Sequence, residues 1–407
     1  MTSNPSSKTI LVAGGGIGGL AAALALTRRG LDVTVLEQAP QIGEIGAGIQ
    51  LGPNAFAAFD ALGVGEPMRA IAVYTDELVM HDAIDEALVG RIPVGEAFRR
   101  RFGNPYAVIH RADLHRCLFD AARESGRVEF ITSTQVASVV QDEAGVSVLD
   151  AKGGTHRGAA LIGADGVKSA VRAQYVGDAA RVSGHVVYRA VVDKADFPAD
   201  LQWNAASIWV GPNCHLVHYP LRGGEQYNVV VTFHSRDAEE WSVTEGSAAE
   251  VLSYFKDVCP RARQLIELPK SWKRWATADR EPIGEWTFGR TTLLGDAAHP
   301  TLQYLAQGAC MALEDGVTLG EALRVHTTTH TTSHANDFAA AFDHYQRSRI
   351  ARTARVVLSA REMGRIFHAS GVERLVRNDL WKGRTPERFY DALEWLYGWR
   401  VETCLAD

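Results

Sequence analysis

Glycine and acidic residues near the N-terminus have the types and spacing needed to bind a dinucleotide. In the run Gly-Gly-Gly-Ile-Gly-Gly, Gly14 permits a tight bend, Gly16 lets the backbone approach a pyrophosphate, and Gly19 lets a helix pack close to a strand. Glu37 follows about 20 residues later. An acid at that place accepts a hydrogen bond from a ribose hydroxyl and repels a 2′-phosphate.

These residues lie in a predicted β–α–β unit. Residues 9–13 and 33–37 are short, apolar and β-branched, which is typical of buried parallel strands. Residues 20–29 between them are rich in alanine and leucine and favour a helix. The predicted helix would direct its free N–H groups and positive dipole end at the phosphates.

Two later motifs choose between NAD and FAD, which fit the first motif equally well. Asp165 lies in Gly-Ala-Asp-Gly after a buried-strand pattern, and Asp296 follows a second such pattern in Gly-Asp-Ala-Ala-His-Pro. Asp296 is suited to bind a second ribose or a ribityl hydroxyl. Gly308 and Ala309 open a predicted helix whose N–H groups could stabilise negative charge on a reduced isoalloxazine ring. The three motifs together favour FAD.

The 407 residues are enough for more than one structural region. We predict an α/β fold in which residues 1–183 form a Rossmann-like FAD-binding domain and residues 184–276 form an inserted antiparallel β-sheet that binds the substrate. Residues 277–335 return to the FAD-binding domain, and residues 336–407 are mostly helical. Within the first domain, the segments 128–131, 136–141 and 146–149 suggest a small antiparallel layer.

Composition excludes several other classes. The formal net charge of −6 disfavours nucleic acid and anionic membranes as partners, and no apolar run approaches the roughly 20 residues of a membrane helix. The polar start lacks a signal peptide, and five scattered cysteines fit reduced thiols, so we expect a cytoplasmic protein. Three histidines, His326, His330 and His334, could bind a metal on a helix, but the intervening threonines favour a loop, and we expect no metal site.

The ordered motifs resemble the single-component aromatic flavoprotein monooxygenases, the family of para-hydroxybenzoate hydroxylase and salicylate hydroxylase, over nearly the whole chain. The resemblance makes Asp165, with Ser169 and Arg172, a motif that serves both FAD and the nicotinamide nucleotide. It places Asp296 on the flavin ribose and Arg111 in contact with FAD. It also implies tightly bound FAD, NAD(P)H as a transient co-substrate, for which we favour NADH, and a homodimer.

In this family a flavin hydroperoxide donates oxygen to an aromatic ring, which reacts well only as an ionised phenol. The site therefore needs a base, a group that holds the other ring substituent, and exclusion of water. Alternation along residues 214–220 puts His215 and Tyr219 on one face of a strand and His218 on the other. A histidine with a pKa near neutrality suits phenol activation.

Within the family, the Cys-His strand that ends in Tyr-Pro-Leu-Arg-Gly-Gly and a Leu-Gln-Tyr-Leu segment resemble the 3-hydroxybenzoate 6-hydroxylases. This resemblance implies that His215 and Gln303 bind and deprotonate the phenol of 3-hydroxybenzoate, that Tyr219 and Tyr304 contact the substrate, and that para-hydroxylation gives gentisate. Arg189 could bind the carboxylate, although pairing with a neighbouring acid is commoner. A salicylate 1-hydroxylase, a hydroxynicotinate hydroxylase and a flavin-dependent dehydrogenase remain alternatives.

Overall fold

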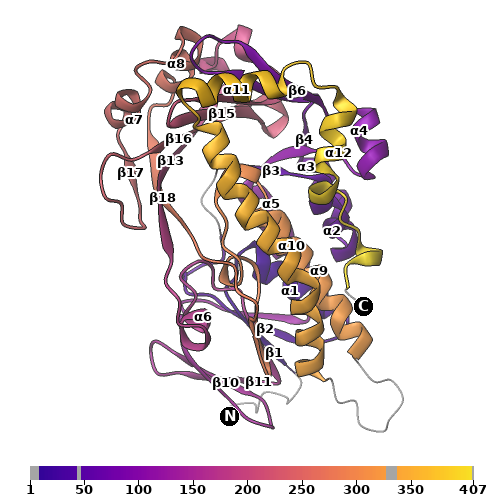
Figure 1. Ribbon diagram of the computed structural model, residues 1–407. Helices are drawn as coiled ribbons and strands as arrows, with labels where there is room; N and C mark the ends of the chain where they lie inside the picture. The colour runs from indigo at the N-terminus through magenta and orange to yellow at the C-terminus, as the bar shows by residue number, and fades with distance from the viewer. Residues whose placement is uncertain (1–8, 44–46, 327–336, 406–407) are drawn as a thin grey trace.

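A six-stranded sheet, which lies in the lower half of the molecule in Figure 1, brings the three motifs to one of its edges. The computed structural model describes residues 9–43, 47–326 and 337–405. The sheet has the order β19-β20-β12-β1-β2-β8, and all its neighbouring strands run parallel except the pair β19 and β20. Its strands are β1 (Ile10–Ala13), β2 (Val33–Leu36), β8 (Val128–Ile131), β12 (Ala160–Gly163), β19 (Thr287–Phe288) and β20 (Thr291–Leu293).

The motifs follow four strands that are adjacent in this sheet. Gly14 comes directly after β1, Glu37 after β2, Asp165 just beyond β12, and Asp296 just beyond β20. Because the carboxyl ends of parallel strands meet at the same edge, the fold gathers residues that lie far apart in the sequence. The predicted Rossmann-like arrangement is confirmed.

The small antiparallel layer differs from its prediction in one strand. It consists of β9 (Val136–Gln141), β10 (Val146–Asp150) and β11 (Thr155–Gly158). Residues 128–131 instead form β8, the edge strand of the parallel sheet, paired with β2. The prediction was wrong because a short, partly apolar run has the same pattern at the edge of a parallel sheet as in an antiparallel layer.

An eight-stranded sheet forms the second layer, in the order β17-β18-β13-β16-β15-β14-β5-β6. Its strands are β5 (Glu77–Asp82), β6 (Leu88–Pro93), β13 (Arg181–Asp193), β14 (Ala205–Gly211), β15 (Cys214–Leu221), β16 (Gln226–His234), β17 (Val243–Gly246) and β18 (Trp272–Asp279). Residues 184–276 supply most of this sheet, as predicted, but β5 and β6 come from the first segment and join through parallel pairing of β5 with β14. Local patterns do not reveal such distant pairing, and the domain boundaries stay a prediction.

Helices cover both sheets and connect them. A third small sheet consists of β3 (Gly48–Leu51), β4 (Val73–Tyr74) and β7 (Ala107–His110). The helices are α1 (Ile17–Thr27), α2 (Pro53–Leu62), α3 (Gly65–Ile71), α4 (Glu96–Phe102), α5 (Arg111–Glu124), α6 (Ala170–Tyr175), α7 (Ala248–Tyr254), α8 (Pro260–Glu267), α9 (Gly308–His326), α10 (Phe338–Phe367), α11 (Gly371–Trp381) and α12 (Pro386–Tyr397). Figure 1 shows α10 running beside α9 from the level of the parallel sheet to the level of the large sheet.

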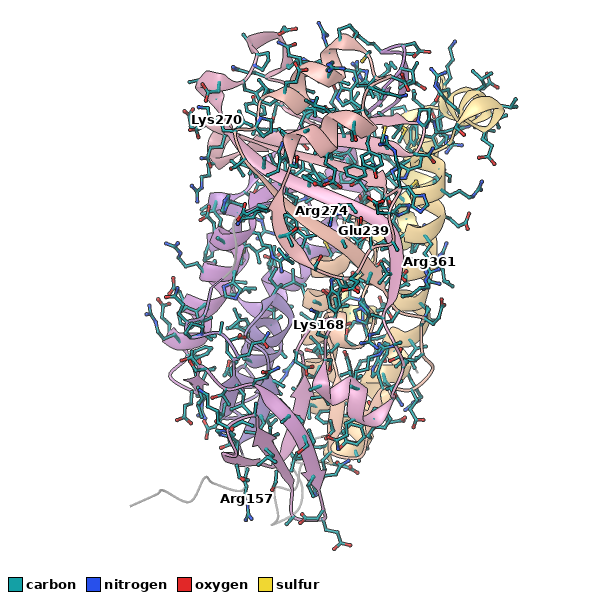
Figure 2. The ribbon with its side chains drawn as sticks, turned by 90° about the vertical axis from the view of Figure 1, so that its left-hand side faces the viewer. Arg157, Lys168, Glu239, Lys270, Arg274 and Arg361 are labelled. Carbon is teal, nitrogen blue, oxygen red and sulfur yellow. The ribbon has the colours of Figure 1, made fainter. Side chains whose placement is uncertain are left out.

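The predicted helical C-terminal region is confirmed, and ion pairs fix it to the sheets. In Figure 2, Arg361 of α10 lies at the side of the large sheet, where its Nε is 2.7 Å from Asp279 at the end of β18. In the same view Arg274 and Glu239 point toward each other on that sheet, 2.7 Å apart. None of the described helices combines the length and apolarity needed to cross a bilayer.

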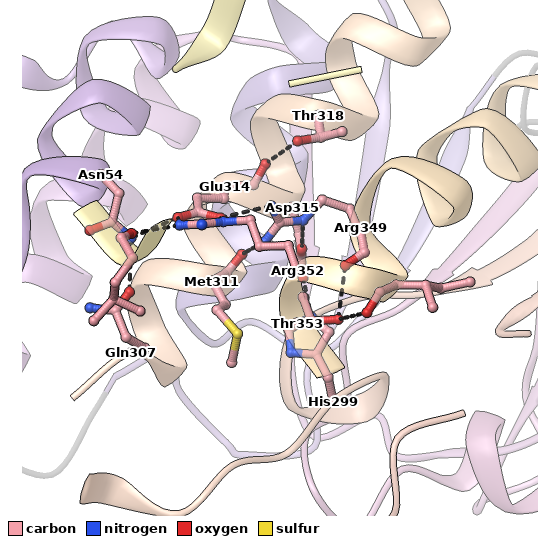
Figure 3. Close-up of polar contacts among 12 residues, drawn as sticks. Asn54, His299, Gln307, Met311, Glu314, Asp315, Thr318, Arg349, Arg352 and Thr353 are labelled. Atoms are coloured by element: carbon pink, nitrogen blue, oxygen red, sulfur yellow. Dashed lines mark hydrogen bonds and ion pairs between the residues drawn. The ribbon is translucent and has the colours of Figure 1, made fainter. Parts of the chain in front are cut away.

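A buried charge cluster joins α9 and α10 to the loop after β20 (Figure 3). Asp315 accepts hydrogen bonds from the backbone N–H of Gly295 at 3.0 Å and from Arg349 Nε at 2.6 Å, and its Oδ2 lies 2.6 Å from His299 Nε2. Burial by itself would raise the pKa of Asp315, but His299 and Arg349 outweigh it and lower the pKa to about 2.

The second half of the cluster holds the segment that leads into α9. Glu314 forms an ion pair with Arg349 at 2.7 Å and two hydrogen bonds with Arg352, each 2.7 Å long. Asn54 donates from Nδ2 to Glu314 Oε1 at 2.6 Å and to Gln307 Oε1 at 2.8 Å. Arg352 also donates to backbone carbonyls of α12, so the cluster fixes the C-terminal helices as well.

We predict that Arg349→Met lowers the free energy of unfolding by about 3–5 kcal/mol, because it leaves two buried carboxylates short of a cation. Arg347→Met is the matched control on the same helix. Arg347 is 53% exposed in its pair with Asp343, so its loss costs about 1 kcal/mol or less. Urea unfolding followed by circular dichroism compares the two. Equal midpoints for the two variants would contradict the role of the cluster.

The same cluster predicts a pH dependence. The pKa of Asp315 is lowered in the folded state, so its contribution is complete above the unfolded pKa of about 3.9 and is lost as the pH falls toward 2. Thermal unfolding between neutral pH and pH 2 should therefore show a steeper acid loss for the wild type than for Arg349→Met. Parallel curves would contradict this assignment.

Candidate active site

One cavity of about 1140 Å³ lies between the motif edge of the parallel sheet, the large sheet and the C-terminal helices. Residues far apart in the chain meet in its wall. The predicted site residues that line it are Gly14, Gly16, Glu37, Arg111, Asp165, His215, Tyr219, Asp296, Gln303, Tyr304, Gly308 and Ala309. Three residues to which the sequence analysis gave a role at the cofactor site, Gly19, Ser169 and Arg172, are absent from the lining. The place of Gly19 is structural.

The three glycines of the first motif have different surroundings. Gly14 has a φ of +101°, and a Cβ atom there would lie 2.4 Å from the carbonyl oxygen of Ala164. A Cβ atom on Gly19 would lie 1.9 Å from the carbonyl oxygen of Gly14, so the helix packs on the strand as predicted. Apart from Gly16 itself and its neighbours in the chain, no described residue has an atom within 4 Å of the ideal Cβ position of Gly16. Gly16 therefore faces open space in the cavity wall.

The two acids at the sheet edge are held by backbone N–H groups. Glu37 accepts from Gly15 and from Ala39, each at 2.7 Å. Asp165 Oδ2 accepts from the N–H of Ala170 at 2.8 Å, at the start of α6. Burial raises the pKa of Asp165, and its Oδ1 atom is buried with no hydrogen-bond partner among the described residues. A buried, unpaired oxygen in a cavity wall is suited to a hydroxyl donor from a ligand.

Ser169 and Arg172 support this region without lining the cavity. Ser169 caps α6 by accepting from the N–H of Arg172 at 2.8 Å. The Arg172 guanidinium pairs with Asp178 at 2.7 Å and donates to the carbonyl of Ala298 at 2.5 Å. Arg172 therefore connects the segment after β12 to the segment after β20. The cofactor role that the family resemblance implies for these two residues stays a prediction.

His215 lies on β15, buried at 3% exposure, in the wall formed by the large sheet. Val217 and Tyr219 line the same wall, whereas His218 is on the opposite face among Phe197 and Trp203. Burial and the neighbouring His185 lower the pKa of His215 to about 3. The expectation of a near-neutral pKa is therefore wrong, because sequence gives no measure of desolvation. His215 is neutral at pH 7.

Gln303 and Tyr304 form a short turn opposite this wall. The Gln303 amide lies 3.4 Å from Thr232 Oγ1. The Tyr304 hydroxyl lies 2.8 Å from Nδ1 of His185, and its ring packs against Gly364 of α10. Tyr304 therefore presents mainly its ring to the cavity. Burial raises the pKa of both Tyr219 and Tyr304, so both hydroxyls are protonated at pH 7.

Arg189 on β13 also lines the cavity. Within the described part of the chain, it lacks the pairing with a neighbouring acid that is the commoner case for an arginine. Its guanidinium carbon lies 5.6 Å from the centroid of the Trp275 ring, but no acidic side chain pairs with it among the described residues. Burial lowers the pKa of Arg189, with Arg111 contributing in the same direction and Tyr219 opposing it. A partly buried cation in a cavity wall without a carboxylate partner is suited to an anionic ligand.

Sequence reasoning missed other parts of the wall. Lys168, which lies between the two sheets in Figure 2, stacks over the ring of Trp241 at 4.6 Å and lines the cavity. Trp381, Arg384 and Phe389 reach it from α11, α12 and the residues between them. The clustered aromatics near the C-terminus were the only sequence signal for that contact. His326 ends α9, whereas His330 and His334 lie outside the described residues, so the loop prediction there is untested.

Comparison with known proteins places the chain in a family. The FAD binding domain family model matches residues 7–360. The chain is 76% identical over 406 residues, covering 100% of both chains, to 3-hydroxybenzoate 6-hydroxylase of Polaromonas naphthalenivorans (strain CJ2), and 58% identical, covering 97% of this chain and 98% of the relative, to that of Klebsiella oxytoca. Klebsiella pneumoniae HpxO, solved with FAD and uric acid, superposes with a TM-score of 0.81 at 27% identity, covering 98% of this chain and 97% of that one.

The chain belongs to the FAD-binding family of single-component aromatic hydroxylases. FAD is its cofactor, and the cavity has features that fit it. The open space at Gly16 leaves room for the pyrophosphate, and the unpaired Oδ1 of Asp165 suits a hydroxyl donor. Asp296 lines the same cavity, with its Oδ1 3.9 Å from the ideal Cβ position of Gly308 at the start of α9. The roles of individual residues stay predictions.

The glycines give a paired test of this assignment. Gly16→Ala should leave the fold intact and weaken FAD binding about tenfold or more, because the added methyl group enters ligand space. Gly19→Ala should instead destabilise the apoprotein by about 1–3 kcal/mol, because its methyl group meets the Gly14 carbonyl. FAD titration and thermal unfolding of both variants measure the two effects. Normal FAD affinity in Gly16→Ala would show that the pyrophosphate lies elsewhere.

Proposed function

We propose that this protein is a 3-hydroxybenzoate 6-hydroxylase, which uses NADH and O₂ to convert 3-hydroxybenzoate into gentisate. The observation that carries the proposal is 76% identity over the whole chain to a relative of that name. The pocket chemistry supports it, because a neutral imidazole and an arginine that has no acidic partner among the described residues line the same cavity as the FAD motifs.

Each end of the substrate has a partner in this proposal. Gly16, Asp165 and Asp296 at the motif edge would hold FAD, which would supply the redox chemistry that couples oxidation of NADH to activation of O₂. His215 accepts the proton of the ring hydroxyl, and Gln303 binds the same oxygen, so that the ring becomes the electron-rich phenolate that oxygen insertion requires. The buried walls around His215 exclude water, which favours transfer of oxygen to the ring over release of hydrogen peroxide.

Arg189 and Tyr219 are proposed to hold the carboxylate. Tyr219 lines the cavity near Arg189, and its protonated hydroxyl can donate to an anion. The hydroxyl also lies 2.7 Å from the ideal Cβ position of Gly48, so a larger residue there would displace the ring. A charged anchor at one end and a hydrogen-bonding pair at the other would fix which ring carbon faces the flavin.

A homodimer and a cytoplasmic location are also proposed. The exposed apolar side chains on α11 support self-association, and their spacing puts them on one face of the helix. They are Val372, Leu375, Val376 and Leu380. Light scattering gives the mass of the holoenzyme directly, and a monomeric mass would overturn the dimer. Five free thiols are consistent with a reducing compartment.

His215→Ala tests the proposed reaction. The variant should retain FAD but lose hydroxylation by about 10²-fold or more, because the phenol stays protonated. Oxygen uptake, NADH consumption and chromatography of the products measure turnover and coupling. The wild type should form gentisate from 3-hydroxybenzoate. Another product would overturn the assigned ring position. Normal coupled turnover by His215→Ala would show that His215 is not the base.

Arg189→Met tests the carboxylate anchor. Losing a hydrogen-bonded ion pair worth about 1.5–3 kcal/mol should raise the KM for 3-hydroxybenzoate about 10- to 100-fold. Arg189→Lys keeps the charge, so its KM for 3-hydroxybenzoate should lie between those of the wild type and Arg189→Met. The control substrate is 3-hydroxybenzyl alcohol, which lacks the charge and should be affected little by either variant. An equal loss with both substrates would show that Arg189 does not bind the carboxylate.

A further inference from the structure

His215 has a hydrogen-bonding partner on the side away from the cavity. Its Nδ1 atom lies 2.8 Å from Nε2 of His368, the C-cap residue that follows α10. The planes of the two rings are tilted by 38°, and their centroids are 5.0 Å apart. None of the described residues forms a hydrogen bond with the Nε2 atom of His215. The direct contact therefore leaves that nitrogen for a ligand in the cavity.

Further histidines continue from this pair toward the surface. The His185 ring centroid is 5.1 Å from that of His368 and 5.2 Å from that of His234. His234 is exposed, His185 is partly buried, and His368 is 8% exposed. The Tyr304 hydroxyl, 2.8 Å from His185 Nδ1, orients the His185 ring. The cluster thus spans the protein from the cavity wall to solvent.

A lone base at His215 would face a physical difficulty. Burial lowers the pKa of His215 to about 3, lowers that of His185 to about 4, and places that of His368 well below its ordinary value. A proton that stayed on any of these rings would create a poorly solvated cation beside other imidazoles. Deprotonation of a phenol at pH 7 therefore needs a route that carries the proton onward.

We propose that His368 receives a proton from His215 as the substrate loses its own, so that the histidine pair passes the phenol proton toward solvent. His368 contacts His215 and does not line the cavity, so it is a positioning residue that acts through the base. The proposal rests on the proposed function, since it needs a phenol as the ligand. It adds His368 to the residues that take part, gives the proton a direction from the cavity toward solvent, and makes solvent its final destination.

The transfer balances without any further reactant. The phenol O–H bond breaks and a new N–H bond forms at Nε2 of His215. The N–H bond at Nδ1 of His215 breaks and a new one forms at Nε2 of His368. His368 then releases its Nδ1 proton to water or toward His185. The phenolate stays in the cavity, and both rings end neutral with their tautomers exchanged.

Proton release on substrate binding tests the relay directly. The oxidised holoenzyme is mixed rapidly with 3-hydroxybenzoate in weak buffer that contains a pH-indicator dye, while near-ultraviolet absorbance follows phenolate formation. We expect the wild type to release a proton as the phenolate forms. His368→Gln keeps a side-chain amide that can hydrogen-bond His215 but cannot relay a proton, and it should slow both signals about tenfold or more.

His368→Ala provides a chemical-rescue arm. Added imidazole should restore fast release in His368→Ala, whose missing ring leaves space, and should leave His368→Gln slow. A structural role would give the opposite pattern, with His368→Gln near wild type and no response to imidazole in either variant. FAD content and thermal unfolding of each variant are measured alongside.

The outcomes separate the two proposals. Wild-type binding without phenolate formation would overturn both of them. Phenolate formation that is lost in His215→Ala but keeps its wild-type rate in His368→Gln would overturn the relay alone. If neither His368 variant folds, the wild-type release rate in mixtures of H₂O and D₂O decides. If two protons move together, the release rate should depend on the deuterium fraction along a curve. A linear dependence of that rate would overturn the relay.

Discussion

The arrangement of this site depends on two neighbouring buried carboxylates, Glu314 and Asp315, and on the arginines that neutralise them. Asp315 holds the loop after β20 through Gly295 and His299, and Glu314 holds the segment before α9 through Asn54. The arginines come from α10, and Arg352 reaches α12 as well. Desolvation makes each charge costly when unpaired, so the elements that surround the cavity are fixed to one another.

That fixed frame brings together two kinds of site in one cavity. The glycine backbone and the acids at the ends of the parallel strands suit a dinucleotide. The large sheet contributes a neutral histidine and an arginine that no acid in the described part of the chain neutralises. The two ends of the proposed substrate pocket differ in charge. An aromatic acid with a ring hydroxyl matches both ends, which an uncharged phenol or a plain benzoate does not.

Sequence patterns predicted the parts that depend on local geometry. Gly14, Glu37, Asp165 and Asp296 could be placed at one edge because each follows a strand-like run, and alternation placed His215 on the cavity face. Properties set by distant contacts were missed. Three of them depend on tertiary packing alone: the joining of β5 to the large sheet, the lack of an acid beside Arg189 among the residues that the structure describes, and the contact of His215 with His368, 153 residues away.

The central claim concerns the orientation of the substrate in the cavity. A crystal structure of the holoenzyme with FAD and 3-hydroxybenzoate therefore tests it most directly. The account predicts the ring hydroxyl within about 2.6–3.2 Å of His215 Nε2, with Gln303 on the same oxygen and the carboxylate facing Arg189. A reversed ligand, with its carboxylate at His215 and its hydroxyl at Arg189, would contradict the account.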